Sequence, residues 1–183
     1  MNSLSLFTDV SLNPKFRVGM GAYLVVPTSL LAISADRIER SKAAELLMMR
    51  RFKSTSSTRL EVQTVLWALE DYRKELKEVR PGKLCIYSDS QCIAGLLRRR
   101  SELEAKGFLS GKTNCLLKNA PLYQEFYEAY DQLGFKVIKV TGHSRSCSHD
   151  TVDRIFSCID RGVRKALRIW MQQLKFKTSV SPD

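Results

Sequence analysis

The sequence lacks the features that mark several common classes of protein. Its 183 residues contain no apolar run approaching the ~20 residues of a transmembrane helix, so no membrane span is predicted. Its five cysteines form no C-x-x-C pair and are odd in number, which argues against a zinc site and favours a reduced compartment. The N-terminal segment MNSLSLFTD has no basic stretch, so we expect no signal peptide and a cytoplasmic protein.

Positive charge is what the sequence has in excess. Thirty Lys and Arg stand against nineteen Asp and Glu, a net charge of +11. Residues 98–118 hold six basic and two acidic residues, and residues 154–177 hold seven basic residues and one acidic residue. Clustered basic residues favour the binding of phosphate backbones, although a charged run can also serve only as a solvated face.

Four acidic residues occur in separate local contexts: Asp9 in LFTDVS, Glu61 in TRLEVQT, Asp89 in YSDSQ and Asp153 in TVDRIF. Asp9 and Asp89 follow apolar runs typical of strands, whereas Glu61 and Asp153 lie in runs typical of helices. The carboxyl ends of neighbouring strands face one crevice in an open α/β sheet. Four carboxylates that meet there repel one another unless divalent cations neutralise them. The pattern therefore predicts a site for two Mg²⁺ ions, with Mn²⁺ as an alternative.

Apolar periodicity and turn residues predict a single α/β domain. Strands are expected over residues 4–11, 16–27, 46–53, 84–88 and 135–140. Helices are expected over residues 58–77, directly after Asp89, over residues 122–133 and from about residue 149 onward, and segment 28–44 has room for a short one. Gly19 and Gly21 weaken the second strand unless another backbone or a ligand approaches closely. Gly134 is placed to end a helix.

Taken together, these residues resemble ribonuclease H of type 1 from about Leu4 to Ile159. The resemblance rests on five pieces in order: Asp9, Glu61 in T-R-L-E, Asp89 in Y-S-D-S-Q, His143 in G-H, and Asp153 ten residues later. It implies a ribonuclease H-like α/β fold with a mixed five-stranded sheet, three antiparallel strands followed by parallel strands, flanked by helices. Residues 1–177 then form one domain with an extended basic C-terminal helix, and residues 178–183 form a short flexible tail.

The resemblance also implies an enzyme that cuts the RNA strand of RNA–DNA hybrids by two-metal-ion catalysis, leaving 5′-phosphate and 3′-hydroxyl ends. In that family pattern Asp9 bridges both metals, Asp153 completes the metal on the water side, and Glu61 and Asp89 complete the other. His143 then shuttles a proton or helps the product leave. No small-molecule organic cofactor is expected, and protein partners stay unknown.

Substrate contacts are implied in the same way, because hybrids are recognised through 2′-hydroxyls across the minor groove. Minor-groove positions correspond to Asn13, Ser57, Thr58 and Gln91. A pocket for a DNA phosphate corresponds to Ser56 and Asn119. A basic protrusion that grips the hybrid corresponds to Arg98, Arg99, Arg100, Lys106, Phe108 and Lys112. The hydroxyls of residues 56–58 fit a helix cap equally well.

The chain departs from the family pattern at several positions. Val10 replaces the glycine that usually follows the first aspartate. Because glycine allows another backbone to approach closely, this change predicts slower turnover or a different position of the bound RNA strand. Ser57 and Thr58 stand where asparagine is more usual, and hydroxyls can also donate and accept hydrogen bonds. His149 stands where asparagine is common and can add positive charge beside the metals. The basic C-terminal extension can pack on the sheet, bind phosphates or contact a partner.

Three other classes of protein were weighed. An integrase or transposase of the same fold class needs Asp, Asp and then Glu with 35 residues between the last two, a spacing that Asp89 and Glu125 meet. That assignment leaves Glu61, His143 and Asp153 without a role. A proofreading exonuclease needs Asp-x-Glu on the first strand, which is absent here. A non-catalytic nucleic-acid-binding module normally has lost at least one acid, and all four are present.

Overall fold

The computed structural model describes residues 3–33, 44–75, 83–140 and 150–179; side chains are described for these residues except 75 and 175–179. His143, the predicted proton shuttle, and His149 lie outside the described residues. So does most of the expected tail, of which the described part, residues 178–179, still belongs to the last helix.

One mixed sheet organises the chain. Its strands are β1 (Leu4–Asn13), β2 (Val18–Pro27), β3 (Met48–Phe52), β4 (Leu84–Ser88) and β5 (Lys136–Lys139), in the spatial order β3-β2-β1-β4-β5. The pairs β1–β2 and β2–β3 are antiparallel, whereas β1–β4 and β4–β5 are parallel. The predicted mixed five-stranded sheet is therefore confirmed.

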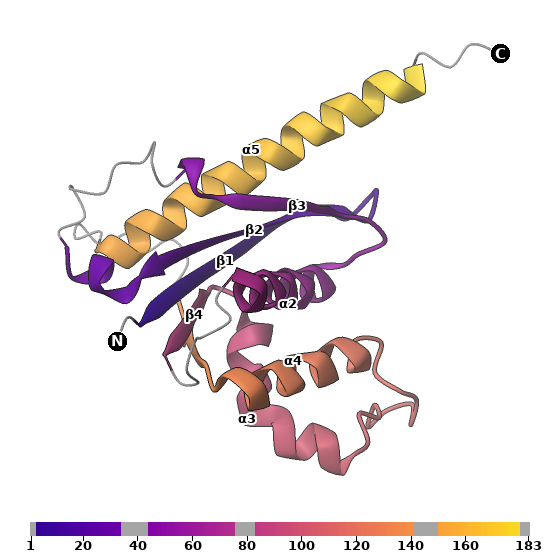
Figure 1. Cartoon of the computed structure of the whole chain (residues 1–183). Helices are drawn as coiled ribbons and strands as arrows, with labels where there is room; N and C mark the ends of the chain where they lie inside the picture. Colours follow the sequence, from indigo (N-terminus) through magenta and orange to yellow (C-terminus); the bar gives the residue numbers. More distant parts are fainter. Residues whose placement is uncertain (1–2, 34–43, 76–82, 141–149, 180–183) are drawn as a thin grey trace.

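Helices cover both faces of this sheet (Figure 1). One face carries α2 (Ser57–Glu75), α3 (Gln91–Ala105) and α4 (Ala120–Leu133), and the other carries α5 (Thr151–Ser179). A short 3₁₀ helix, η1 (Thr28–Ala32), follows β2, as the segment before β3 allowed. Within the described ranges, no helix is both long and apolar enough to cross a bilayer.

Two glycines of β2 allow α2 to lie directly on the sheet. A Cβ atom on Gly19 would stand 2.3 Å from a methyl group of Leu60, and one on Gly21 would stand 2.2 Å from the Thr64 hydroxyl. Both distances are far below van der Waals contact, so any larger residue would force the Leu60 or Thr64 side chain, or α2 itself, to shift. The close approach that the sequence suggested at these glycines is made by α2, which also carries Glu61.

The hydrophobic core has two parts, one on each face of the sheet. The part between the sheet and α5 determines where Asp9 points. Phe7 stacks on Tyr87 with ring centroids 4.6 Å apart, and both pack in this core with Ile159 and Val163 of α5. Side chains alternate between the two faces of a strand. Asp9, two residues after Phe7, therefore projects toward α5.

Helix α3 is longer than expected. The sequence suggested a short helix after Asp89, with the basic stretch following it, but α3 continues through the three arginines to Ala105. Arg100 pairs with Glu104 at 2.7 Å, and Lys106 just past the end pairs with Glu102 at 2.7 Å. Oppositely charged side chains four residues apart stabilise a helix, which explains the extension. Gly134, as predicted, ends α4 in the left-handed conformation (φ 60°, ψ 38°).

Candidate active site

Asp9 lies beneath α5 with only 8% of its surface exposed. Its Oδ1 accepts a hydrogen bond from the Val10 backbone N–H at 2.8 Å, while its buried Oδ2 has no partner among the described residues. Burial raises the pKa of Asp9 to about 7, and the negative charges of Asp89 and Asp160 add to that rise. A buried carboxylate with an unsatisfied oxygen calls for a proton or a cation beside it.

Glu61, in the second turn of α2, is held beside the end of β4. Its Oε2 accepts a 2.5 Å hydrogen bond from the Ser90 hydroxyl, and its Oε1 accepts one of 3.2 Å from the Ser57 hydroxyl. Asp89 stands directly after β4 and next to Ser90 in the chain. The two predicted acids, 28 positions apart, are thereby brought to one place.

Asp89 is electrostatically linked to both other acids. The residue as a whole is exposed, yet partial burial of its carboxyl raises its pKa, and the negative charge of Glu61 raises it further. Asp89 in turn raises the pKa of Asp9. Three of the four predicted acids, from β1, α2 and the end of β4, therefore form one group in which Asp89 repels Asp9 and Glu61 repels Asp89.

The fourth predicted acid, Asp153, is placed differently. It lies in the first turn of α5, where its backbone N–H donates to Asp150 Oδ1 at 2.8 Å. Among the charges that chiefly shift the pKa values of Asp9 and Asp89, Asp160 is present in both cases and Asp153 in neither. Asp160 lies seven residues, or about 10 Å, farther along the same flank of the helix. The negative charge of Asp160, which the sequence had not singled out, therefore acts on both Asp9 and Asp89.

Arg164 of α5 supplies positive charge close to Asp160. Its Nε lies 2.7 Å from Asp160 Oδ1, one helical turn away. Its charge also lowers the pKa of Asp9, opposing the effect of burial. One cation of the chain itself therefore partly offsets the repulsion among the acids.

The donor chemistry of the group fits a divalent cation. Carboxylate oxygens are the ligands that Mg²⁺ and Mn²⁺ prefer, and Asp9 offers a buried oxygen without a partner. As the described side chains stand, no three His, Cys, Asp or Glu residues lie close enough together to hold an ion.

The predicted minor-groove residues lie at the ends of elements. Asn13 ends β1, and its Oδ1 accepts the Phe16 N–H at 3.3 Å. Gln91 begins α3, and its Oε1 accepts a 2.5 Å hydrogen bond from Lys139 Nζ at the end of β5. Gln91 is thus two residues from Asp89, at the edge of the sheet that carries the acids.

The hydroxyl residues predicted to contact substrate open α2. Ser57 and Thr58 are its first two residues, and the Ser56 carbonyl accepts the Leu60 N–H at 2.8 Å. Both Ser56 and Ser57 are exposed. These residues therefore border Glu61 and begin the helix at the same time, so the structural and the functional interpretations are compatible.

The basic protrusion is partly neutralised by its own acids. Arg100 reaches Asp131 of α4 as well as Glu104, with an Nη2–Oδ2 distance of 2.8 Å. Arg99 is half-buried and donates to the Gly95 carbonyl at 3.3 Å. Arg98 and Lys112 are exposed. Of the predicted cations, these two are the most available to a ligand.

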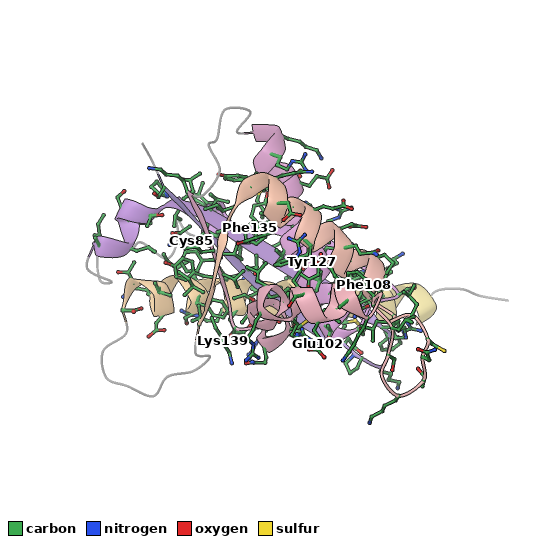
Figure 2. All side chains as sticks on the ribbon, turned by 90° about the horizontal axis from the view of Figure 1, so that it is seen from below. Cys85, Glu102, Phe108, Tyr127, Phe135 and Lys139 are labelled. Carbon is green, nitrogen blue, oxygen red and sulfur yellow. The ribbon has the colours of Figure 1, made fainter. Side chains whose placement is uncertain are left out.

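Phe108 is part of the core rather than the surface. Only 7% of it is exposed, and its ring lies 6.3 Å from that of Tyr127, where Figure 2 labels both. Its backbone has φ of 57°, a left-handed conformation in the loop between α3 and α4. Asn119, before α4, also has a buried Oδ1 without a partner in the part of the chain described.

Two residues important to this arrangement were missed from the sequence. Ser90 follows Asp89 in a D-S-Q segment, and a serine just before a helix is a signal for a cap that was available. Asp160 gave no signal, because its place depends on how α5 lies across the sheet. Glu125, the third acid of the integrase hypothesis, is exposed on α4 and lines a groove with Trp67 and Arg73, away from the acid group.

Comparisons with known proteins agree with this geometry. The RNase H family model matches residues 1–157, most of the chain. The solution structure of the PFV RNase H domain superimposes with a TM-score of 0.63 at 14% identity, covering 90% of this chain and 93% of that domain. A foamy viral protease-reverse transcriptase in complex with dsDNA gives 0.54 at 12% identity, covering 86% and 92%.

No curated protein sequence matches the chain. The two structures, at such low identity, establish the fold, and the family model establishes the relationship. The match contains all four predicted acids, the strand β1 that carries Asp9, and the strand β4 that Asp89 directly follows. The chain therefore belongs to the RNase H family of nucleases.

Proposed function

We propose that this nuclease hydrolyses the RNA strand of RNA–DNA hybrids by two-metal-ion catalysis, and that its products carry 5′-phosphate and 3′-hydroxyl ends. The observation that carries the proposal is the coupled group of Asp9, Glu61 and Asp89, held at one edge of the sheet by three different elements. Such repulsion is costly for folding alone and is useful where a cation and a phosphate must bind.

The acids of the group would bind the metal ions in this proposal. The carboxylates of Asp9, Glu61 and Asp89 would hold the ions, and Mg²⁺, when bound, lowers the pKa of water and stabilises the leaving oxygen. The interaction of Asp160 with Asp9 and Asp89 supports Asp160 as the contribution of α5. The Ser90 hydroxyl orients Glu61 through their 2.5 Å hydrogen bond.

A hybrid substrate is supported by the polar residues around the acids. Ser57 and Thr58 begin α2, which carries Glu61, and Gln91 begins α3, two residues after Asp89. Hydroxyl and amide groups can both donate to and accept from a ribose 2′-hydroxyl, the group that distinguishes RNA from DNA. A location in the cytoplasm remains part of the proposal.

Cleavage of matched duplexes tests the proposal. RNA–DNA, RNA–RNA and DNA–DNA duplexes of one sequence are incubated with the protein and Mg²⁺, Mn²⁺ or EDTA. We expect the RNA strand to be cut in the hybrid alone, only with metal, and the downstream fragment to carry a phosphate that phosphatase removes. Cutting or joining of DNA would contradict the proposal and favour the integrase alternative.

A further inference from the structure

The outer face of α5 carries a continuous row of cations. Arg161, Arg164, Lys165 and Arg168, here named the α5 ridge, are all exposed. Arg161 is followed by Arg164 and Lys165 three and four residues later, and Arg168 lies four and three residues beyond these two, which places all four on one face of a helix. Val163 and Trp170 lie on the opposite face and are buried against the sheet, at 0% and 3% exposure. The ridge is therefore held rigidly toward solvent by the packing beneath it.

Most of the ridge is not neutralised as Arg100 of α3 is. Among the residues described, Lys165 and Arg168 have no acidic group within ion-pair distance. Arg161 donates to the Ser157 carbonyl at 3.1 Å, an interaction that leaves its charge uncompensated. Of the four ridge cations, Arg164 alone pairs with an acid of the described part of the chain, Asp160. Three of the four ridge cations therefore have no acidic partner among the described side chains, and their charge is available to an anionic ligand.

The ridge acts electrostatically on the acid group through Arg164 and its partner Asp160. Arg164 acts electrostatically on Asp9, and its ion-pair partner Asp160 acts on both Asp9 and Asp89. From there α5 continues past the sheet, as Figure 1 shows. Arg161 to Arg168 spans about 10 Å at 1.5 Å per residue, enough for about three phosphates of one strand. The ridge thus leads away from the place where a phosphodiester would be cut.

We propose that the α5 ridge binds the phosphate backbone of the nucleic acid as it leaves the acid group, extending the bound length beyond the cleaved segment. The inference rests on the proposed function for its ligand. The alternative occupant, an acidic protein surface, lacks the continuity with the acid group that favours a nucleic acid.

The test uses Lys165→Gln together with Arg168→Gln, two exposed residues away from the acids. The matched control is Arg73→Gln with Lys136→Gln, which removes the same charge from exposed positions on α2 and β5. Equilibrium binding of hybrid, RNA–RNA and DNA–DNA duplexes is measured between 50 and 200 mM salt, without divalent metal so that the nucleic acid stays intact. Thermal melting shows whether each variant is folded.

We expect the ridge variant to weaken binding of hybrids of every sequence and to lower the log–log salt slope by up to ~2, while the control changes neither. The loss should be smaller on a duplex shortened on the side of the ridge. Equal slopes for parent, control and ridge variant would overturn the inference, and the cleavage assay on the parent would still judge the proposed function separately. Equal losses in both variants would also overturn it, because they would show a general charge effect.

Discussion

The Ser90 side chain joins Glu61 to the first turn of α3. Its Oγ donates to Glu61 Oε2 at 2.5 Å and accepts the Ile93 backbone N–H at 3.2 Å. Ser90 directly follows Asp89, so this pair of bonds holds the α2 carboxylate beside the end of β4. The Ser90 side chain therefore caps α3 and also holds Glu61 close to Asp89.

Replacing Ser90 with Ala should affect both roles. Loss of the helix cap should cost about 1 kcal/mol of unfolding free energy. Loss of the bond to Glu61 should lower kcat on the hybrid roughly tenfold, since this acid would no longer be oriented. Ser90→Thr, which keeps a hydroxyl, should recover most of the activity. Denaturation and steady-state kinetics of both variants check this; unchanged kcat in a destabilised Ser90→Ala would leave only the capping role.

The raised pKa of Asp9 predicts how stability depends on pH. The pKa is about 7 in the folded protein against 3.8 ordinarily, so the folded state binds more protons between these values. Stability of the metal-free protein should therefore fall as pH rises from about 4 to about 7. Asp9→Asn should show a shallower fall and melt higher than the parent at pH 8. Melting curves in EDTA measure this; parallel curves for parent and variant would contradict the burial of this charge.

The two aspartates of α5 should differ in metal binding. Asp160→Asn should weaken Mg²⁺ binding and hybrid cleavage at least tenfold, because Asp160 interacts with Asp9 and Asp89. Asp153→Asn is the matched control on the same helix and should have the smaller effect. Calorimetric Mg²⁺ titration measures binding independently of activity. The reverse order would restore Asp153, the family-motif acid, to the site.

Glu125 and Glu61 test the integrase alternative. Glu125→Gln changes an exposed residue of α4 and should leave hybrid cleavage within about twofold of the parent. Glu61→Gln changes the acid bound by Ser90 and should reduce cleavage by several orders of magnitude. The two variants are compared in parallel assays of hybrid cleavage and of cleavage or joining at DNA ends. A larger loss for Glu125→Gln than for Glu61→Gln would mean that Glu125, and not Glu61, is the third acid of the site.

The sequence predicted those parts of the site that depend on local patterns. Asp9 and Asp89 follow strand-like runs, and Glu61 has helical phase, so their meeting followed from the rule that strand ends share a crevice. Asp160 depends on the angle and register at which a long helix crosses the sheet. Local periodicity carries no information on either quantity.

The predicted basic protrusion shows a second limit of what the sequence alone could predict. The basic run around Arg100 suggested a surface free for phosphates, but Arg100 pairs with Asp131, 31 positions away on α4. Phe108, an aromatic residue within that run, is buried against the same helix. Charge and aromatic content can be counted in a sequence, whereas their partners depend on tertiary packing.

Single-turnover cleavage by Asp9→Asn tests the central claim most directly. The variant keeps the side-chain size but removes the charge of the buried acid that links β1 to Asp89 and Asp160. With Mg²⁺ and saturating protein, we expect RNA cleavage in the hybrid to fall by at least a thousandfold, while the hybrid binds with a Kd within about threefold of the parent. Cleavage within tenfold of the parent rate would contradict the account.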